Sequence, residues 1–269
     1  MWSTILSVIW QRFNVSRRAY PWSEIGGNLL AAVVPFLAGW ILLRFVFGGR
    51  VDNSFTQESG GTNYLGFLAI GLATYMNMTG VLLAVGRSLI TEQREGTLDA
   101  LFLTPVSRIG YTLGYTFYQL LLQVPPTIAL FVIAWLSGAQ IQVLAPGAVL
   151  VNLVMAVIGF YGMSLVLASV MLAIRETFIT QNTLTTALYV FSGILFPVGY
   201  LPKPLRFLSE GLPSTRILHL LRNAWLYGLG PRDLPADYAL TAMVALGFLL
   251  LGIWLLRHVE RLALADMTW

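Results

Sequence analysis

Six long apolar stretches constrain the fold of this chain more than any other feature of its sequence. They cover residues 27–47, 63–88, 110–136, 147–173, 178–199 and 237–256. None of them carries a charged residue across its middle. A helix needs roughly 20 mainly apolar residues to cross about 30 Å of hydrocarbon. We therefore expect an all-α integral membrane protein with six transmembrane helices.

The scarcity of charge supports this fold class and excludes several kinds of function. Only 10% of the residues are charged, whereas a soluble domain carries roughly 25%. The absence of cysteine excludes disulfides, thiol catalysis and Cys-ligated metal sites. Lys203 is the only lysine, and no Gly-x-x-x-x-Gly-Lys-Ser/Thr run surrounds it. The chain therefore has no Walker-type ATP site. The net charge of +4 does not indicate a nucleic-acid partner, because in a membrane protein the placement of basic residues matters more than their sum.

The basic residues predict the orientation of the spans, because short cytoplasmic loops are enriched in arginine and lysine. One side of the predicted topology carries Arg12, Arg17, Arg18, Arg87, Arg94, Arg108, Arg175, Arg257 and Arg261. The short loops on the other side carry only Arg44 and Arg50. With an even number of spans, both termini are expected in the cytoplasm, and the protein is expected in the cytoplasmic (inner or plasma) membrane.

Residues 1–20 have the pattern of an amphipathic helix. Apolar side chains recur at helical spacing at Trp2, Ile5, Leu6, Ile9, Trp10 and Phe13. Such a helix suits the inner membrane interface, with its arginines near anionic headgroups of membrane lipid. Positive charge follows the apolar residues instead of preceding them, which argues against a signal peptide. The alternative is a disordered basic leader.

The connection between the second and third stretches, residues 89–105, predicts a short helix outside the membrane. Thr97 can cap its amino end, Asp99 complements the helix dipole there, and Pro105 ends it. Two sets of side chains share neighbouring faces: the acidic Glu92, Glu95 and Asp99, and the apolar Leu98, Leu101 and Phe102. Such faces suit docking into a groove on a partner protein. A solvated connector helix remains the alternative.

Three runs in the predicted topology resemble a known family. Residues 92–105, with Glu-Gly-Thr-Leu-Asp at their centre, closely resemble the coupling-helix loop of type-2 ABC exporter permeases. Residues 191–202 resemble the end of that family's fifth span, and residues 212–222 its extracellular re-entrant segment. The resemblance implies a single transmembrane permease domain over residues 1–269. Within it we expect an N-terminal amphipathic interface helix (1–20), a cytoplasmic coupling helix (89–105) and extracellular re-entrant helices (200–236) before the last span.

The resemblance also implies roles for individual residues. An ATPase-coupling role falls on Glu92, Arg94, Glu95, Gly96, Thr97, Leu98, Asp99, Leu101 and Phe102. An extracellular gate falls on Phe196, Pro197, Pro213, Thr215, Leu221 and Arg222. Residues 214–225 also suit an ordinary interfacial helix, which is the alternative for the outer connection.

The partners follow from the same resemblance. Two copies of a separate nucleotide-binding ATPase subunit are expected, together with a second permease that is either the same chain or a paralogue. ATP and magnesium would bind to the ATPase partner, so no cofactor, metal site or catalytic residue is expected in this chain. A prokaryotic source is implied as well.

A substrate path has to be sought among uncharged polar residues. Asn182, Thr185, Thr186 and Tyr189 share one face of the fifth stretch at i, i+3, i+4 and i+7. The second stretch offers Thr74, Tyr75, Asn77 and Thr79, and the third offers Gln119 and Gln123. In the family the second and fifth spans face the dimer axis, so these residues are candidates to line a pathway. Hydrogen bonding between helices is the alternative role for each of them.

These observations favour an exporter of amphipathic substrates over three other classes. A secondary transporter or channel would be expected to place charges inside the membrane, and none lies mid-span. An intramembrane enzyme would need an acid–base pair, a nucleophile with its base or a metal set, and the chain has two distant histidines and no cysteine. A non-catalytic structural subunit stays open.

Overall fold

The computed structural model describes residues 2–19, 23–94, 108–141, 143–174 and 178–266, and these residues contain helices and no strand. The α-helices are α1 (Trp2–Ala19), α2 (Ser23–Ile41), α3 (Asn53–Ser59), α4 (Tyr64–Arg94), α6 (Arg108–Leu136), α7 (Pro146–Ile174), α8 (Phe178–Phe191), α9 (Lys203–Glu210), α10 (Pro213–Arg222) and α11 (Pro235–Asp266). Three short segments of other helix types are η1 (Leu42–Val46), η2 (Val198–Tyr200) and η3 (Asn223–Tyr227).

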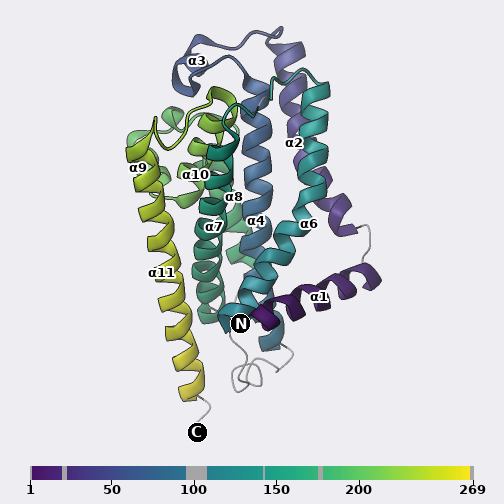
Figure 1. The fold of residues 1–269 in the computed structure, drawn as a ribbon, viewed down its shortest axis with the longest axis vertical. Helices are drawn as coiled ribbons and strands as arrows, with labels where there is room; N and C mark the ends of the chain where they lie inside the picture. Colours follow the sequence, from purple (N-terminus) through teal and green to yellow (C-terminus); the bar gives the residue numbers. More distant parts are fainter. Residues whose placement is uncertain (1, 20–22, 95–107, 142, 175–177, 267–269) are drawn as a thin grey trace.

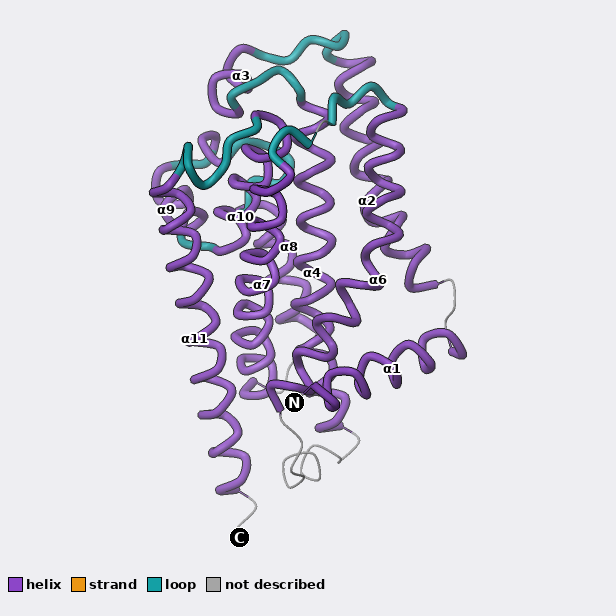
Figure 2. Tube along the Cα trace, in the orientation of Figure 1, coloured by secondary structure: helices purple, strands orange, loops and turns teal. Residues whose placement is uncertain are grey.

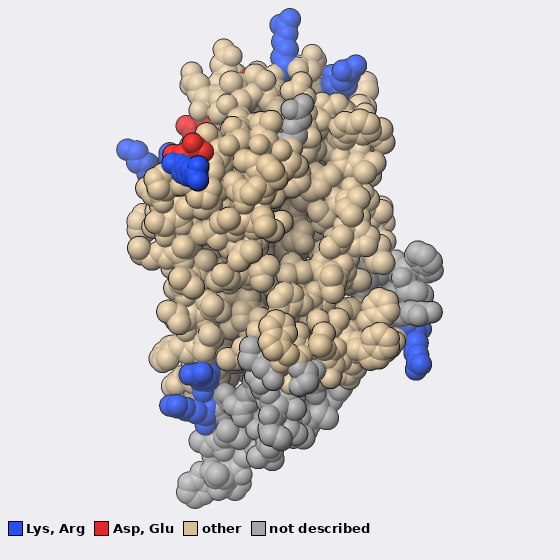
Figure 3. Space-filling view, viewed as in Figure 1, with Lys and Arg blue, Asp and Glu red and all other residues tan. Residues whose placement is uncertain are grey.

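Five helical segments of the described chain are long and apolar enough to cross a membrane. They are Ile25–Val46, Tyr64–Thr91, Ile109–Leu136, Pro146–Ile174 and Pro235–Val259. They match five of the six predicted stretches closely and run along the long axis of the molecule (Figures 1 and 2). Charged side chains on the face shown in Figure 3 gather near its ends and leave its middle uncharged. The prediction of an all-α integral membrane protein is confirmed.

The sixth predicted stretch, 178–199, has a different structure. Its helix, α8, has 14 residues and ends at Phe191, so it is about 21 Å long. The chain then turns at Gly193, whose φ of 70° lies in the left-handed region that glycine adopts readily. Pro197 follows and cannot continue the hydrogen-bond ladder of a helix. The apolar stretch is therefore divided between a short helix and a turn, and the count of six spans stays a prediction.

The predicted amphipathic helix at the amino end is present as α1. It lies across one end of the bundle, almost perpendicular to the long helices (Figure 1). Ile5 and Val8 are buried, and Val8 packs so closely on α6 that a Cβ at Gly114 would lie 2.8 Å from the Val8 Cβ. Trp2, Leu6 and Trp10 are exposed, as suits a helix whose outer face contacts lipid.

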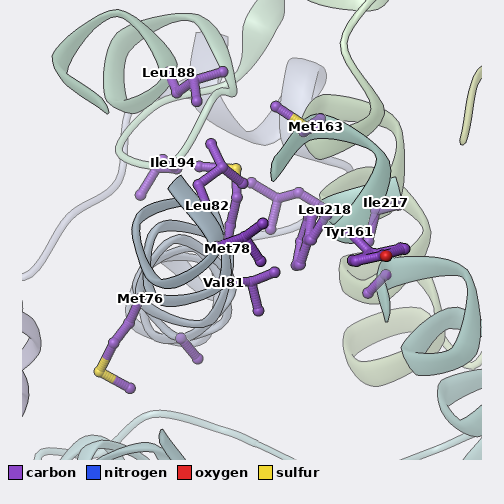
Figure 4. Close-up of a cluster of buried hydrophobic side chains, with 14 of the residues drawn as sticks. Met76, Met78, Val81, Leu82, Tyr161, Met163, Leu188, Ile194, Ile217 and Leu218 are labelled. Carbon is purple, nitrogen blue, oxygen red and sulfur yellow. The ribbon is translucent and has the colours of Figure 1, made fainter. Parts of the chain in front are cut away.

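The two most buried long helices, α4 and α7, form the core of the bundle. Apolar side chains from α4, α7, α8 and α10 meet in one cluster, part of which Figure 4 shows around α4. Met78 and Leu82 of α4 belong to it, as do Met171 of α7 and Ile217 and Leu218 of α10, all at most 1% exposed. Because lipid is as apolar as these side chains, their close packing stabilises the bundle in a membrane.

Helices α7 and α11 approach each other at two glycines. A Cβ at Gly162 would lie 2.6 Å from the backbone nitrogen of Leu249, and one at Gly252 would lie 2.7 Å from the Cβ of Leu165. Distances below 3.0 Å leave no room for a methyl group between the two backbones. Small residues allow this kind of backbone-to-backbone packing in membranes.

Substituting Gly162 by alanine should therefore separate α7 from α11. We expect Gly162→Ala to lower the free energy of unfolding by about 1–3 kcal/mol, the usual cost of inserting a methyl group into a packed site. The measurement is thermal unfolding of the purified chain in mild detergent. Gly247→Ala on α11 is the matched control, because nothing lies within 4 Å of its Cβ position. Equal melting temperatures for the two variants would contradict the role of Gly162.

Candidate functional site

Most of the predicted coupling segment lies outside the described residues. This holds for Glu95, Gly96, Thr97, Leu98, Asp99, Leu101 and Phe102. Glu92 and Arg94 fall in the last turn of α4, where the backbone alone is described. Helix α4 continues for 31 residues without a break and ends at Arg94, immediately before this segment.

A cavity of about 430 Å³ lies between α1, α2, α4 and α6, and we call it the α4–α6 cavity. Tyr75, Thr79, Gln119 and Gln123, four of the predicted pathway residues, line it together. Tyr75 and Thr79 belong to one face of α4, and Gln119 lies opposite on α6. The structure thus brings together predicted residues from the second and third spans around a space large enough for a ligand.

The polar face of α8 meets the same part of α4. The Tyr75 hydroxyl donates to the Thr185 carbonyl oxygen at 3.4 Å, and the Tyr75 and Tyr189 rings pack edge to face with centroids 4.8 Å apart. Asn182 and Thr186 are exposed. Two of the four α8 candidates therefore contact α4, while the other two are exposed on the surface of α8.

Asn77 faces a different space from Tyr75, because residues two apart on a helix point in nearly opposite directions. Its Nδ2 donates to the Thr127 hydroxyl at 3.1 Å and to the Ala73 carbonyl at 2.9 Å. Asn77 lines an apolar cleft of about 490 Å³ between α4, α6 and α7. The predicted pathway residues of α4 are thus divided between two cavities.

The α4–α6 cavity is also lined by two arginines. The sequence predicts only that they lie on the cytoplasmic side of the membrane. They are Arg12 of α1 and Arg87 of α4. Gln123 of α6 also lines it, is 1% exposed and donates from Nε2 to the Met76 carbonyl at 3.3 Å. The helical spacing of Tyr75, Thr79 and Arg87 places them on one face, so periodicity could have identified Arg87. Nothing local in the sequence indicates that α1 delivers Arg12 to this face.

The predicted gate residues are distributed around the outer connection. A second cavity, of about 350 Å³, is lined by Pro197, Thr215 and Arg222, and we call it the α10 cavity. Pro213 is buried against α7, where a Cβ at Gly159 would lie 3.2 Å from the Pro213 Cβ. Leu221 lines the apolar cleft on the other face of α10. Phe196 is half-buried in the turn after α8.

Arg222 is the most connected of these residues. It is 8% exposed and donates four hydrogen bonds to backbone carbonyl oxygens. Two go to Phe67 at 3.1 and 3.3 Å, one to Gly193 at 2.8 Å and one to Ile194 at 2.9 Å. Its guanidinium also stacks 3.2 Å from the centre of the Phe67 ring. Arg222 therefore fastens the turn after α8 to the outer end of α4.

Glycine at position 71 makes this arrangement possible. A Cβ there would lie 2.5 Å from the Ile194 carbonyl oxygen and 2.7 Å from a guanidinium nitrogen of Arg222. Burial lowers the pKa of Arg222, whereas its four hydrogen bonds to three carbonyl oxygens favour the charged form, and arginine keeps its proton in proteins. For the Gly193 and Ile194 carbonyls, which lie outside any helix, the cation replaces the donors that a regular helix would supply.

The geometry above can be compared with known families. A family model described as ABC-2 type transporter matches residues 12–226. The chain belongs to the ABC-2 type transporter family. The matched region includes α2, α4 and α6 to α10, and it includes the predicted coupling segment. The resemblance drawn from the sequence is therefore confirmed at the level of the family. A comparison with curated proteins gives no match.

Family membership defines the general role of the chain. The ABC-2 membrane domain is the transmembrane component of a transporter and not its ATPase, so this chain is a multi-pass permease subunit. An ABC-2 permease works with an ATP-binding subunit.

Replacing Arg222 tests its structural role in the permease. Arg222→Lys keeps the charge but loses the fork of donors, so several of the three carbonyls lose their partner. We expect the free energy of unfolding to fall by about 2–4 kcal/mol, because hydrogen bonds from charged groups contribute about 1.5–3 kcal/mol each. Thermal unfolding in detergent is the measurement, with Arg232→Lys, an exposed arginine in the same connection, as the control. If both variants melt at the same temperature, Arg222 does not hold the turn.

Proposed function

We propose that this permease is the membrane-spanning half of an ATP-driven exporter. Its substrate is an amphipathic molecule, either a lipid, a lipid-linked glycan or a hydrophobic drug, moved outward across the cytoplasmic membrane. The observation that carries the proposal is the continuity of α4. This one helix leads from the turn fastened by Arg222 to the segment that resembles a coupling helix. Motion at one end of such a rod is transmitted to the other.

The proposed assembly has two permeases above two ATPase subunits. The second permease is the same chain or a paralogue, and the ATPase subunits bind ATP and magnesium. Both termini of the permease lie in the cytoplasm of a prokaryotic cell, on the side of residues 95–105. Exposed Asn182 and Thr186 of α8 suit the subunit interface or the path beside it.

In the proposed cycle, closure of the ATPase pair shifts the coupling segment. Its acidic residues, Glu92, Glu95 and Asp99, contact the ATPase, and its apolar Leu98, Leu101 and Phe102 fill a groove on that partner. The shift passes into α4 and moves the turn after α8, because Arg222 bonds to both. The turn and α10 then act as the outer gate, with Pro197 and Thr215 in the cavity wall.

The substrate is proposed to enter through the α4–α6 cavity. Tyr75, Thr79 and Gln119 offer uncharged polar groups to it. Thr185 and Tyr189 hold Tyr75 in place from α8, which is a positioning role. Asn77 instead bridges α4 and α6 through Thr127, so its contribution is to hold those helices together.

Reversing the charge of the coupling segment tests the function. Permeases are purified from native membranes, and proteins that travel with them are identified by mass spectrometry. The native chain should bring a Walker-motif ATPase, and the variant with Glu95→Lys and Asp99→Lys should lose it. ATP-driven transport should fall at least about tenfold while the spans stay folded, because like-charge contacts at an interface cost several kcal/mol.

Asp52→Lys is the matched control, since it reverses an exposed carboxylate at the start of α3. It should leave both the ATPase and transport in place. Transport that is unchanged in the Glu95/Asp99 variant would remove the coupling assignment. A native chain that carries no ATPase would favour a secondary carrier or a structural subunit.

A further inference from the structure

The α4–α6 cavity is long and its two ends differ in chemistry. Its lining on α4 runs along one face from Leu72 to Thr91, a length of about 28 Å at the rise of an α-helix. Leu72 and Met76 line the end nearer the middle of the bundle, and Arg87 lines the end that leads to the coupling segment. Arg12 of α1 lines the cavity from the same side of the bundle, where α1 crosses it (Figure 1).

Among the described residues, neither arginine of this cavity has a carboxylate partner. Arg12 lies with its guanidinium carbon 4.3 Å from the centre of the Tyr115 ring. Arg87 donates from Nε to the Gln181 Oε1 at 3.2 Å. Both partners are neutral, and the described residues that line the cavity include no Asp or Glu. Charge complementarity therefore calls for an anion between the two arginines.

Apart from the two arginines, the lining of the α4–α6 cavity suits a ligand with a hydrocarbon tail and a polar group next to it. Leu72, Met76, Leu83 and Ala84 supply the apolar wall on α4. Beside Met76, the Gln123 Oε1 is buried and has no hydrogen-bond partner among the described residues. A buried acceptor without a partner is costly, so a ligand that offers a hydroxyl or amide donor would stabilise it.

We propose that the α4–α6 cavity binds an anionic amphiphile, with a phosphate headgroup between Arg12 and Arg87 and an apolar tail along α4. The planar guanidinium fork binds phosphate through paired hydrogen bonds. A cationic amphiphile would be repelled by the same two residues, and free phosphate would leave the apolar length unused. The proposal names the substrate class and so rests on the exporter function proposed above.

The binding experiment uses the full chain in phosphatidylcholine nanodiscs and three soluble probes. These are dihexanoyl phosphatidic acid, dihexanoyl phosphatidylcholine and inorganic phosphate, each titrated by calorimetry. Phosphatidic acid should bind at least about tenfold more tightly than the other two, and more weakly as salt is raised. Arg12→Gln and Arg87→Gln should each weaken it about tenfold, as expected for a lost charged hydrogen bond.

Two further variants separate a cavity site from a bound lipid at the surface. Arg44→Gln removes an exposed arginine of η1, outside the cavity lining, and should change nothing. Ala84→Phe places a larger side chain in the cavity, beside its apolar wall, and leaves both arginines unchanged. It should weaken the binding of phosphatidic acid about tenfold without lowering the melting temperature of the protein. If Ala84→Phe has no effect, or if inorganic phosphate binds as tightly as the lipid, the proposal falls.

The outcome is distinguishable from that of the exporter assignment. If phosphatidylcholine binds as well as phosphatidic acid while the ATPase still co-purifies, the substrate class is wrong and the exporter function stands. If phosphatidic acid binds as expected but no ATPase accompanies the chain, the anionic site stands and the exporter function falls.

Discussion

In a membrane, each backbone amide and carbonyl has to find a hydrogen-bond partner within the protein, and the rest of this structure depends on that constraint. The long helices meet it through their own ladders. The turn after α8 cannot, because its chain leaves the helix while still buried: Ser192, Gly193 and Ile194 are all buried. Arg222 supplies the missing donors from another part of the sequence.

Helices of the bundle contact each other in two ways, and each way is found on a different side of the bundle. Along α7 and α11, glycines bring backbones together and leave no space for a ligand. Along α4 and α6, longer side chains such as Gln119 and Tyr118 hold the helices apart and leave a cavity. At Gly80 of α4, a glycine and a long side chain meet, since a Cβ at Gly80 would lie 2.6 Å from the Gln123 amide nitrogen of α6. The permease thus has a closely packed side and a side that contains a cavity.

The sequence predicts the parts of this structure that depend on hydrophobicity along one helix. The spans at 63–88 and 147–173 agree with α4 and α7 to within a few residues, apart from the continuation of α4 to Arg94. Prediction from the sequence fails where contacts between distant segments determine the structure. The break after Phe191 depends on Arg222 as much as on Gly193, and the separation of Tyr75 from Asn77 depends on which helices flank α4. The charge of the cavity depends on α1 crossing the bundle, which no local pattern specifies.

The bonds from Arg222 to Phe67 join residues that are 155 positions apart. During synthesis at about 5–20 residues per second, the outer end of α4 is made on the order of ten seconds before its partner. Until Arg222 is in place, the Gly193 and Ile194 carbonyls need other donors, such as water. This end of the bundle therefore cannot be completed before α10 has been made, however early α4 inserts.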